Sequence, residues 1–128
     1  MRLVCIDPHL YWPQVRDLIK KAMDRGIGGF DDIEWDILHD RATLWAVFDG
    51  DLIKATAVTQ LTEKDDKTNC TIVACGGRDL NEWGHFISGL EDYARKEGCA
   101  VMRIIGRRGW QRVLKDYRVR SVTLEKVL

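Results

Sequence analysis

The chain has 128 residues, with a hydrophobic fraction of 45% and a charged fraction of 31%, values typical of a single globular domain spanning residues 1–128. Its formal net charge is zero, so no bulk field favours nucleic acid as a partner. No apolar run is long enough to span a membrane, and Met1–Asp7 lacks the apolar core of a signal peptide, so we expect a cytoplasmic protein.

The cysteines and histidines indicate neither a metal site nor a disulfide framework. There are four cysteines and three histidines, and none is spaced like the ligands of a zinc site. We therefore expect no bound metal and reduced thiols, as is usual in the cytoplasm.

The first third of the chain predicts one strand and two helices. Residues 2–7 are a strand that Pro8 ends. A helix follows Tyr11-Trp12, with Pro13 in its first turn, where the missing N–H costs little, and glycines from 26 onward end it. Residues 31–40 predict a short second helix whose cap lies near its first aspartates.

The middle of the chain predicts three strands joined by tight turns. Residues 43–49 and 52–62 flank Asp49-Gly50-Asp51, a hairpin signal because glycine tolerates the positive φ of such turns. A polar turn at 65–67 leads to a third strand at 69–75, which ends at Gly76-Gly77.

The last third predicts helix, strand, helix and strand. The helix at 80–97 is amphipathic, with Asp79 and Glu82 in capping-box positions and Gly98 after its end. A buried strand at 100–105 and a short helix at 107–117 follow. The chain closes with an alternating strand at 119–127.

This order, β-α-α-β-β-β-α-β-α-β, predicts the α+β class. A hairpin meander followed by a strand–helix–strand unit gives a mixed, mostly antiparallel sheet flanked by helices. The strands at 69–75 and 100–105 should be parallel, with a right-handed crossover.

Charge is unevenly distributed despite the zero total. An acidic region includes Asp31, Asp32, Glu34, Asp36 and Asp40, and a basic region includes Arg103, Arg107, Arg108, Arg112 and Arg118. The two regions are either solvated faces that pair with each other, or the basic one is an anion site near Arg107 and Arg108.

In element order, the chain resembles the GNAT acetyltransferase superfamily. The resemblance rests on the strand–turn–strand at 44–53, the helix end at 90–99, and the terminal strand–helix–strand unit. The run Gly-Arg-Arg-Gly-Trp-Gln-Arg-Val-Leu at 106–114 looks like small GNAT-like proteins of phages and prophages.

The resemblance implies an acyl-CoA, such as acetyl-CoA, as cofactor. In the family, the strands matching 69–75 and 100–105 splay apart, the pantetheine inserts between them, and a glycine-rich loop at the next helix N-terminus holds the diphosphate. The residues implied here as cofactor-binding are Val73, Ala74, Cys75, Gly76, Gly77, Arg78, Trp83 and Arg107.

The loop departs from the family pattern at the helix start. Arg78 matches its first position, but Asn81 and Trp83 stand where the family has small residues. Asp79 and Glu82 would add negative charge where a diphosphate must sit.

The catalytic residues that the resemblance implies are Tyr117 and Glu63. In many members, a tyrosine of the last helix protonates the CoA thiolate; Val113 or Leu114 aligns there, and Tyr117 lies close by in sequence. Glu63 and His85 are candidate bases. Cys75, which ends a strand before a helix, is a weaker candidate nucleophile.

The sequence leaves open whether the chain is an enzyme. One interpretation is an acyl-CoA-dependent N-acyltransferase with an unknown amine acceptor. The other is a catalytically inactive GNAT-like module that binds a protein partner in a phage context. Nucleic-acid binding through the basic region is a third, weaker hypothesis.

Overall fold

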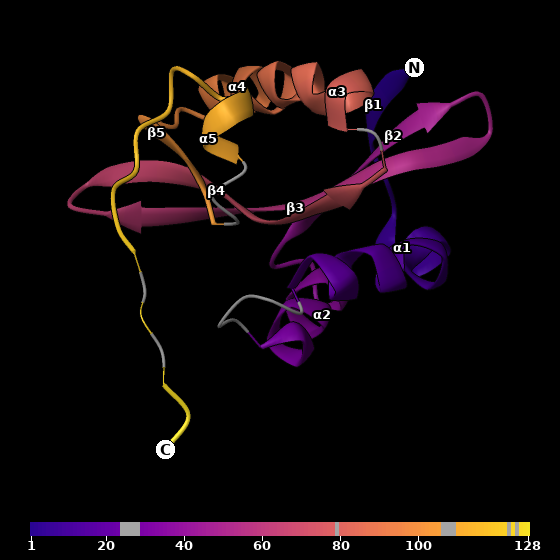
Figure 1. The fold of residues 1–128 in the computed structure, drawn as a ribbon, viewed down its shortest axis with the longest axis horizontal. Helices are drawn as coiled ribbons and strands as arrows, with labels where there is room; N and C mark the ends of the chain where they lie inside the picture. The colour runs from indigo at the N-terminus through magenta and orange to yellow at the C-terminus, as the bar shows by residue number, and fades with distance from the viewer. Residues whose placement is uncertain (24–28, 79, 106–109, 123, 125) are drawn as a thin grey trace.

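The fold is a five-stranded mixed sheet with helices on both faces (Figure 1). The computed structural model describes residues 1–23, 29–78, 80–105, 110–122, 124 and 126–128. The strands are β1 (Arg2–Cys5), β2 (Thr43–Asp49), β3 (Leu52–Lys64), β4 (Lys67–Gly77) and β5 (Val101–Ile104). The helices are α1 (Pro8–Met23), α2 (Phe30–Leu38), α3 (Leu80–Trp83), η1 (Gly84–Phe86), α4 (Ile87–Lys96) and α5 (Trp110–Val113).

The strand order is β1-β2-β3-β4-β5. The first four strands pair antiparallel, and β5 pairs parallel to β4. These pairings confirm the predicted mostly antiparallel sheet and its one parallel pair. Both hairpin turns use left-handed backbone, at Gly50 (φ 61°) and at Asp65 and Asp66 (φ 56° and 62°), as tight hairpins require.

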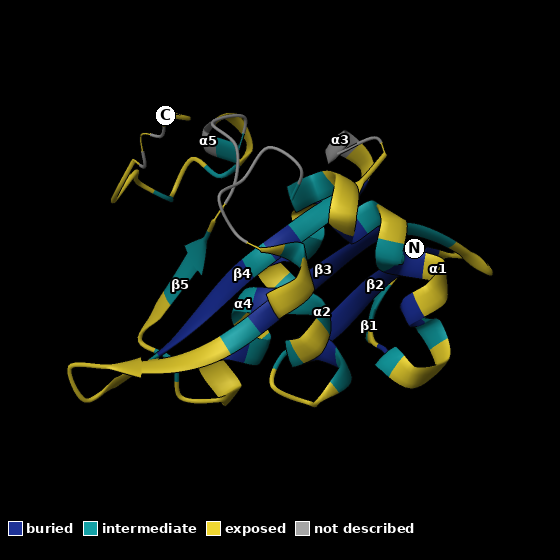
Figure 2. Cartoon of the chain, turned by 90° about the horizontal axis from the view of Figure 1, so that it is seen from below, coloured by how far each residue is buried: buried dark blue, intermediate teal, exposed yellow. Residues whose placement is uncertain are grey.

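Two apolar layers hold the helices to the sheet. On one face, α1 and α2 pack on a cluster that contains Val15, Ile19 and Ile37, all fully buried. On the other face, α4 packs through Ile87 and Leu90 on Trp45 and its neighbours. Figure 2 shows β2, β3 and β4 buried between these layers, while the far end of the β3–β4 hairpin is exposed.

The first helix begins earlier than predicted. It starts at Pro8, because Asp7 caps it: the Asp7 carboxylate accepts the His9 N–H at 2.9 Å, and the Asp7 carbonyl accepts the Leu10 and Tyr11 N–H groups. Pro8 suits this first position, since its missing N–H has no helical partner to lose. Pro13 lies inside the helix, where its side chain is exposed.

The predicted single helix at 80–97 is three pieces. A 3₁₀ turn at Gly84–Phe86 separates α3 from α4, and glycine at this interior position weakens the helical preference. The expected cap Asp79 lies outside the described residues. Gly98 ends α4 with φ 79°, as predicted.

The predictions for the C-terminal part are mostly wrong. Helical structure covers only Trp110–Val113 of the described part of 107–117, and the described residues of 119–127 form no strand. In residues 119–127, each of the two alternating sets of side chains contains both apolar and polar residues. Neither set would therefore form an apolar face that could be buried against the sheet. Val119 is 53% exposed and Leu124 is 91% exposed.

Candidate functional site

The sheet opens between β4 and β5. The two strands pair only from Asn69 with Val101 to Ile72 with Ile104, and the Ile105 N–H then donates to the Ile72 carbonyl at 3.1 Å. β4 continues to Gly77 along β3. Within the part of the chain that the structure describes, no strand pairs with the β5 side of β4 from residue 73 onward, so its outward backbone groups have no ladder partners there.

A bulge at Val73 accounts for this opening. Val58 of β3 opposes Ala74, whereas Thr59 opposes Ile72, so Val73 is the extra residue. Val73 and Ala74 both pack toward α1 and α2, which breaks the alternation of the strand. A bulge bends its strand and increases its twist, which turns the end of β4 away from β5.

Two glycines let the end of β4 pack closely. A Cβ at Gly76 would lie 3.0 Å from the Leu18 carbonyl oxygen, and one at Gly77 would lie 2.7 Å from the Ala55 Cβ. Tight contact with α1 and β3 thus explains Gly76 and Gly77 without a phosphate. Arg78 follows them with an exposed side chain.

Trp83 covers the opening on the α4 side. Its side chain is 4% exposed, its indole N–H donates to the Arg78 carbonyl at 2.7 Å, and its ring meets Trp110 edge-on with the centroids 6.1 Å apart. Trp83 therefore joins the loop after β4 to α5 and takes up space at the helix start.

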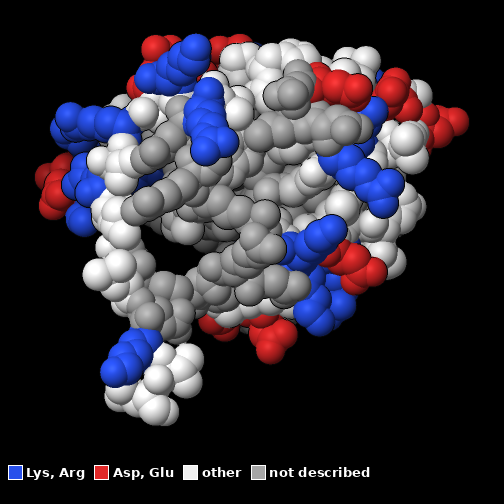
Figure 3. Space-filling view, viewed as in Figure 1, with Lys and Arg blue, Asp and Glu red and all other residues white. Residues whose placement is uncertain are grey.

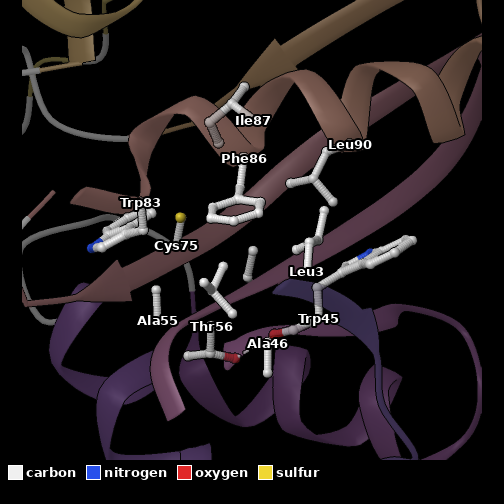
Figure 4. Close-up of a pocket in the computed structure, with 12 residues that line it drawn as sticks. Leu3, Trp45, Ala46, Ala55, Thr56, Cys75, Trp83, Phe86, Ile87 and Leu90 are labelled. Carbon is white, nitrogen blue, oxygen red and sulfur yellow. Dashed lines mark hydrogen bonds between the residues drawn. The ribbon is translucent and has the colours of Figure 1, made fainter. Parts of the chain in front are cut away.

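A small apolar cavity lies beside Trp83, between α4 and the sheet (Figure 4). Its volume is ≈ 20 Å³, and Cys75, Phe86 and Ile87 are among its lining residues. That is about the space of one water molecule, so the cavity is a packing defect and cannot hold an acyl chain as it stands.

Glu82 of α3 forms an ion pair with the neighbouring strand β3. The Glu82 carboxylate lies 2.6 Å from the Lys54 Nζ of β3. The predicted capping box would join Glu82 to the backbone of Asp79, which lies outside the described residues, so that prediction stays untested. Lys54 neutralises part of the negative charge that would otherwise repel a diphosphate.

Burial raises the pKa of the Cys75 thiol to about 12. The thiolate is the nucleophilic form of cysteine, so Cys75 stays protonated at neutral pH. The structure does not support the nucleophile hypothesis, and Cys75 instead contributes to the wall of the cavity.

Tyr117 is held on α4. Its hydroxyl donates to the Glu91 carboxylate at 2.6 Å. Burial, and then the hydrogen bond and charge of Glu91, raise the pKa of Tyr117 well above its ordinary value. Tyr117 therefore keeps its proton, but that proton points to Glu91.

The two candidate bases, Glu63 and His85, have exposed side chains. Glu63 is next to the last residue of β3, opposite Thr68 at the exposed hairpin end. His85 stacks on Phe86 with the ring centroids 4.2 Å apart. Neither makes a side-chain hydrogen bond or ion pair with the other described residues.

The structure brings together only part of the predicted site. Residues 73–77 form one strand end with Trp83 over it, whereas Glu63 lies at the exposed hairpin end and the Tyr117 hydroxyl is bonded to Glu91 of α4. Arg107 and Arg108 lie outside the described residues. The amphipathic periodicity predicted that Trp110 and Phe86 face the core, and both pack on the cluster that contains Trp83, but neither was among the predicted site residues.

On the face seen in Figure 3, the described charged side chains do not gather into a patch of one sign. Basic and acidic side chains are interspersed around this face (Figure 3).

None of the helices in the described ranges is long and apolar enough to cross a bilayer.

Solved structures of acetyltransferases have the same fold. A probable acetyltransferase superposes with a TM-score of 0.73 at 11% identity, covering 100% of this chain and 97% of its own. The glucosamine-6-phosphate N-acetyltransferase of Arabidopsis thaliana gives 0.72 at 10% identity, with 98% and 97% covered. An aminoglycoside acetyltransferase from an uncultured soil sample, in complex with sisomicin, gives 0.70 at 9% identity, with 99% and 95% covered.

No family model and no curated protein matches the chain. The likeness in structure nevertheless extends over the whole chain, so the protein has the GNAT acetyltransferase fold that the element order predicted.

Proposed function

We propose that the protein is an acyl-CoA-dependent N-acyltransferase that works in the cytoplasm. The proposal rests on the bulged end of β4, which continues for five residues beyond the last residue of β4 that pairs with β5. A strand end of this kind offers backbone N–H and C=O groups in an extended row, and such a row can pair with the amides of a pantetheine arm.

The residues along this strand end suit part of an acyl-CoA. Val73, Ala74 and Cys75 would hold the pantetheine arm. Gly76 and Gly77 lack side chains, which lets the strand end pack closely on α1 and β3. Arg78, exposed beyond them, has the charge to pair with a phosphate, and Arg107 is proposed as its second cationic partner. Trp83 would have to shift to admit the diphosphate at the start of α3.

An acyl-CoA supplies an activated thioester, whose acyl carbon bonds to the amine nitrogen while the C–S bond breaks and its electron pair leaves with sulfur. A backbone N–H of the unpaired β4 edge would polarise the acyl carbonyl. An ordered water molecule is the proposed acceptor of the amine proton, because Glu63 lies at the hairpin end opposite Thr68, five residues before Val73 along β4. Tyr117 is the proposed donor to sulfur. Tyr117 can donate only after its hydroxyl leaves Glu91.

The test is calorimetry with acetyl-CoA, paired with an assay of thiol release in the presence of small amines. We expect binding of acetyl-CoA, and Arg78→Glu should weaken it about tenfold, because one phosphate contact becomes a repulsion. Lys64→Glu, at the exposed hairpin end, is the control and should not change the affinity. Failure to bind acetyl-CoA at millimolar concentration would rule the proposal out.

A specific observation favours a second candidate, a catalytically inactive module that binds a protein partner. Trp83 is packed at the place of a small residue, and its indole is bonded to the Arg78 carbonyl. If this packing is permanent, the diphosphate has no room. In that case Trp83→Gly, but not the natural protein, would bind CoA.

A further inference from the structure

A row of three polar side chains crosses the α2-facing side of the sheet just before the opening. Gln60 of β3 is in register with Thr71 of β4, and Thr71 with Arg103 of β5. We call these three residues the polar row. Thr71 is buried, so the row is part of the sheet face and not of a solvated edge.

The two ends of the polar row fix the side of the sheet on which it lies. Met102 and Ile104 pack beneath α4, and successive side chains of a strand alternate, so Arg103 points to the opposite side. At the other end, the Gln60 amide donates to the Asp36 carboxylate of α2 at 2.8 Å. A cationic group therefore stands at one end of the row and a carboxylate beside the other.

One buried nitrogen of the Arg103 side chain, Nε, has no hydrogen-bond partner among the described residues. No carboxylate within the described ranges forms an ion pair with its guanidinium. Leaving a buried donor of a charged group unpaired is costly, so an acceptor atom on a ligand would stabilise this arrangement.

The polar row also lies beside the proposed reaction centre. Arg103 precedes Ile104, the last residue of β5 that pairs with β4, so only about 3.3 Å of strand separates it from the opening. The α4 side of the opening is covered by apolar and aromatic groups such as Trp83 and Phe86. Among the described groups next to the opening, the polar row is therefore the one that matches a charged amine.

We propose that Arg103 binds an anionic group of the amine acceptor, so that the substrates are amines that also carry a carboxylate or a phosphate. This inference rests on the proposed acyltransferase function. A guanidinium offers paired N–H donors that match the oxygens of either anion.

The test compares three acceptors that differ in the anionic group: β-alanine, O-phosphoethanolamine and β-alaninamide, which has none. Thiol release from acetyl-CoA by the full chain gives kcat/KM for each. We expect one of the two acceptors with an anionic group to exceed β-alaninamide at least tenfold, and which one does so identifies the anion. Arg103→Met should abolish this preference, lowering kcat/KM for the preferred anionic amine at least tenfold more than for β-alaninamide, and Arg103→Lys should keep part of it.

Arg120→Met removes an exposed arginine and serves as the matched control, which should keep the full preference. Circular dichroism shows whether each variant folds, and Arg103→Lys replaces Arg103→Met in the comparison if the latter does not. Equal rates with all three amines, or a preference that survives in Arg103→Met, would overturn this inference and leave the proposed function standing. No acetyl-CoA binding would overturn both.

Discussion

At the scale of single residues, Trp83 matters most for the candidate site. It stands where the family loop has a small residue, and it ties Arg78, Ala55 and Trp110 together. The same contacts that stabilise the fold therefore restrict access to the start of α3.

Trp83→Ala should lower the free energy of unfolding by about 3–5 kcal/mol, because it removes a buried indole and leaves a cavity. Urea unfolding followed by circular dichroism measures the change. Trp35→Ala is the control; its side chain is 47% exposed, so its effect should be much smaller. Equal effects of the two substitutions would show that Trp83 is not packed as described.

Glu34 gives a second prediction at this scale. Its carboxylate accepts hydrogen bonds from the Trp12 indole and the Arg16 guanidinium, each at 2.7 Å. These bonds, that of Trp12 first, hold the pKa of Glu34 below its usual 4.5. A lowered pKa stabilises the fold above the unfolded-state value and loses that effect as the pH falls through the folded-state value.

Glu34→Gln should therefore lower the melting temperature most at pH 7, and this difference should shrink as the pH falls below about 4.5. Thermal melts from pH 7 to pH 3 measure it. Glu63→Gln, at an exposed position without a described partner, should cause no such pH-dependent difference. A Glu34→Gln effect that stays constant down to pH 3 would contradict the proposed role of the carboxylate.

At the scale of elements, the sequence predicted the regular strands and the hairpins well. Val58 and Ile72 lie in strands whose apolar residues specify burial, and Gly50 marks its turn unambiguously. The start of α1 was wrong, because Asp7 followed by Pro8 is itself a strong helix start and was taken for the end of a strand. The bulge at Val73 could not be predicted, since it depends on how β3 and β4 pair.

The C-terminal segment was predicted wrongly for a different reason. Alternation of residue type indicates a strand only when a neighbouring strand buries one of its faces. Val122 is 64% exposed and Leu128 is fully exposed. The segment leaves the body of the molecule after α5 (Figure 1).

Deleting residues 119–128 should change the free energy of unfolding by no more than about 0.5 kcal/mol, because its described apolar side chains bury little surface. Urea unfolding of the shortened chain tests this. Deleting residues 117–128 should cost more, because Tyr117 then no longer bonds to Glu91. A loss of several kcal/mol on the shorter deletion would show that this segment packs on the domain.

At the scale of the whole molecule, the order of elements was enough to predict the fold but not the site. The GNAT fold consists of a meander, a crossover helix and one parallel strand. Each of these elements has a recognisable pattern of apolar and turn residues in the sequence. The site depends on contacts between distant segments, such as Trp83 with Trp110 and Thr71 with Arg103. No periodicity in the sequence reports these contacts, so the polar row became visible only in the folded sheet.

The central claim is that the unpaired end of β4 binds an acyl-CoA. Titration of the isotope-labelled protein with acetyl-CoA, followed by amide chemical shifts, tests it most directly. We expect the amide signals from Val73 to Arg78 to shift, while those of Thr68 and Asn69, in the paired part of the same strand, do not. Unchanged amide shifts at millimolar acetyl-CoA, or shifts confined to another surface, would contradict it.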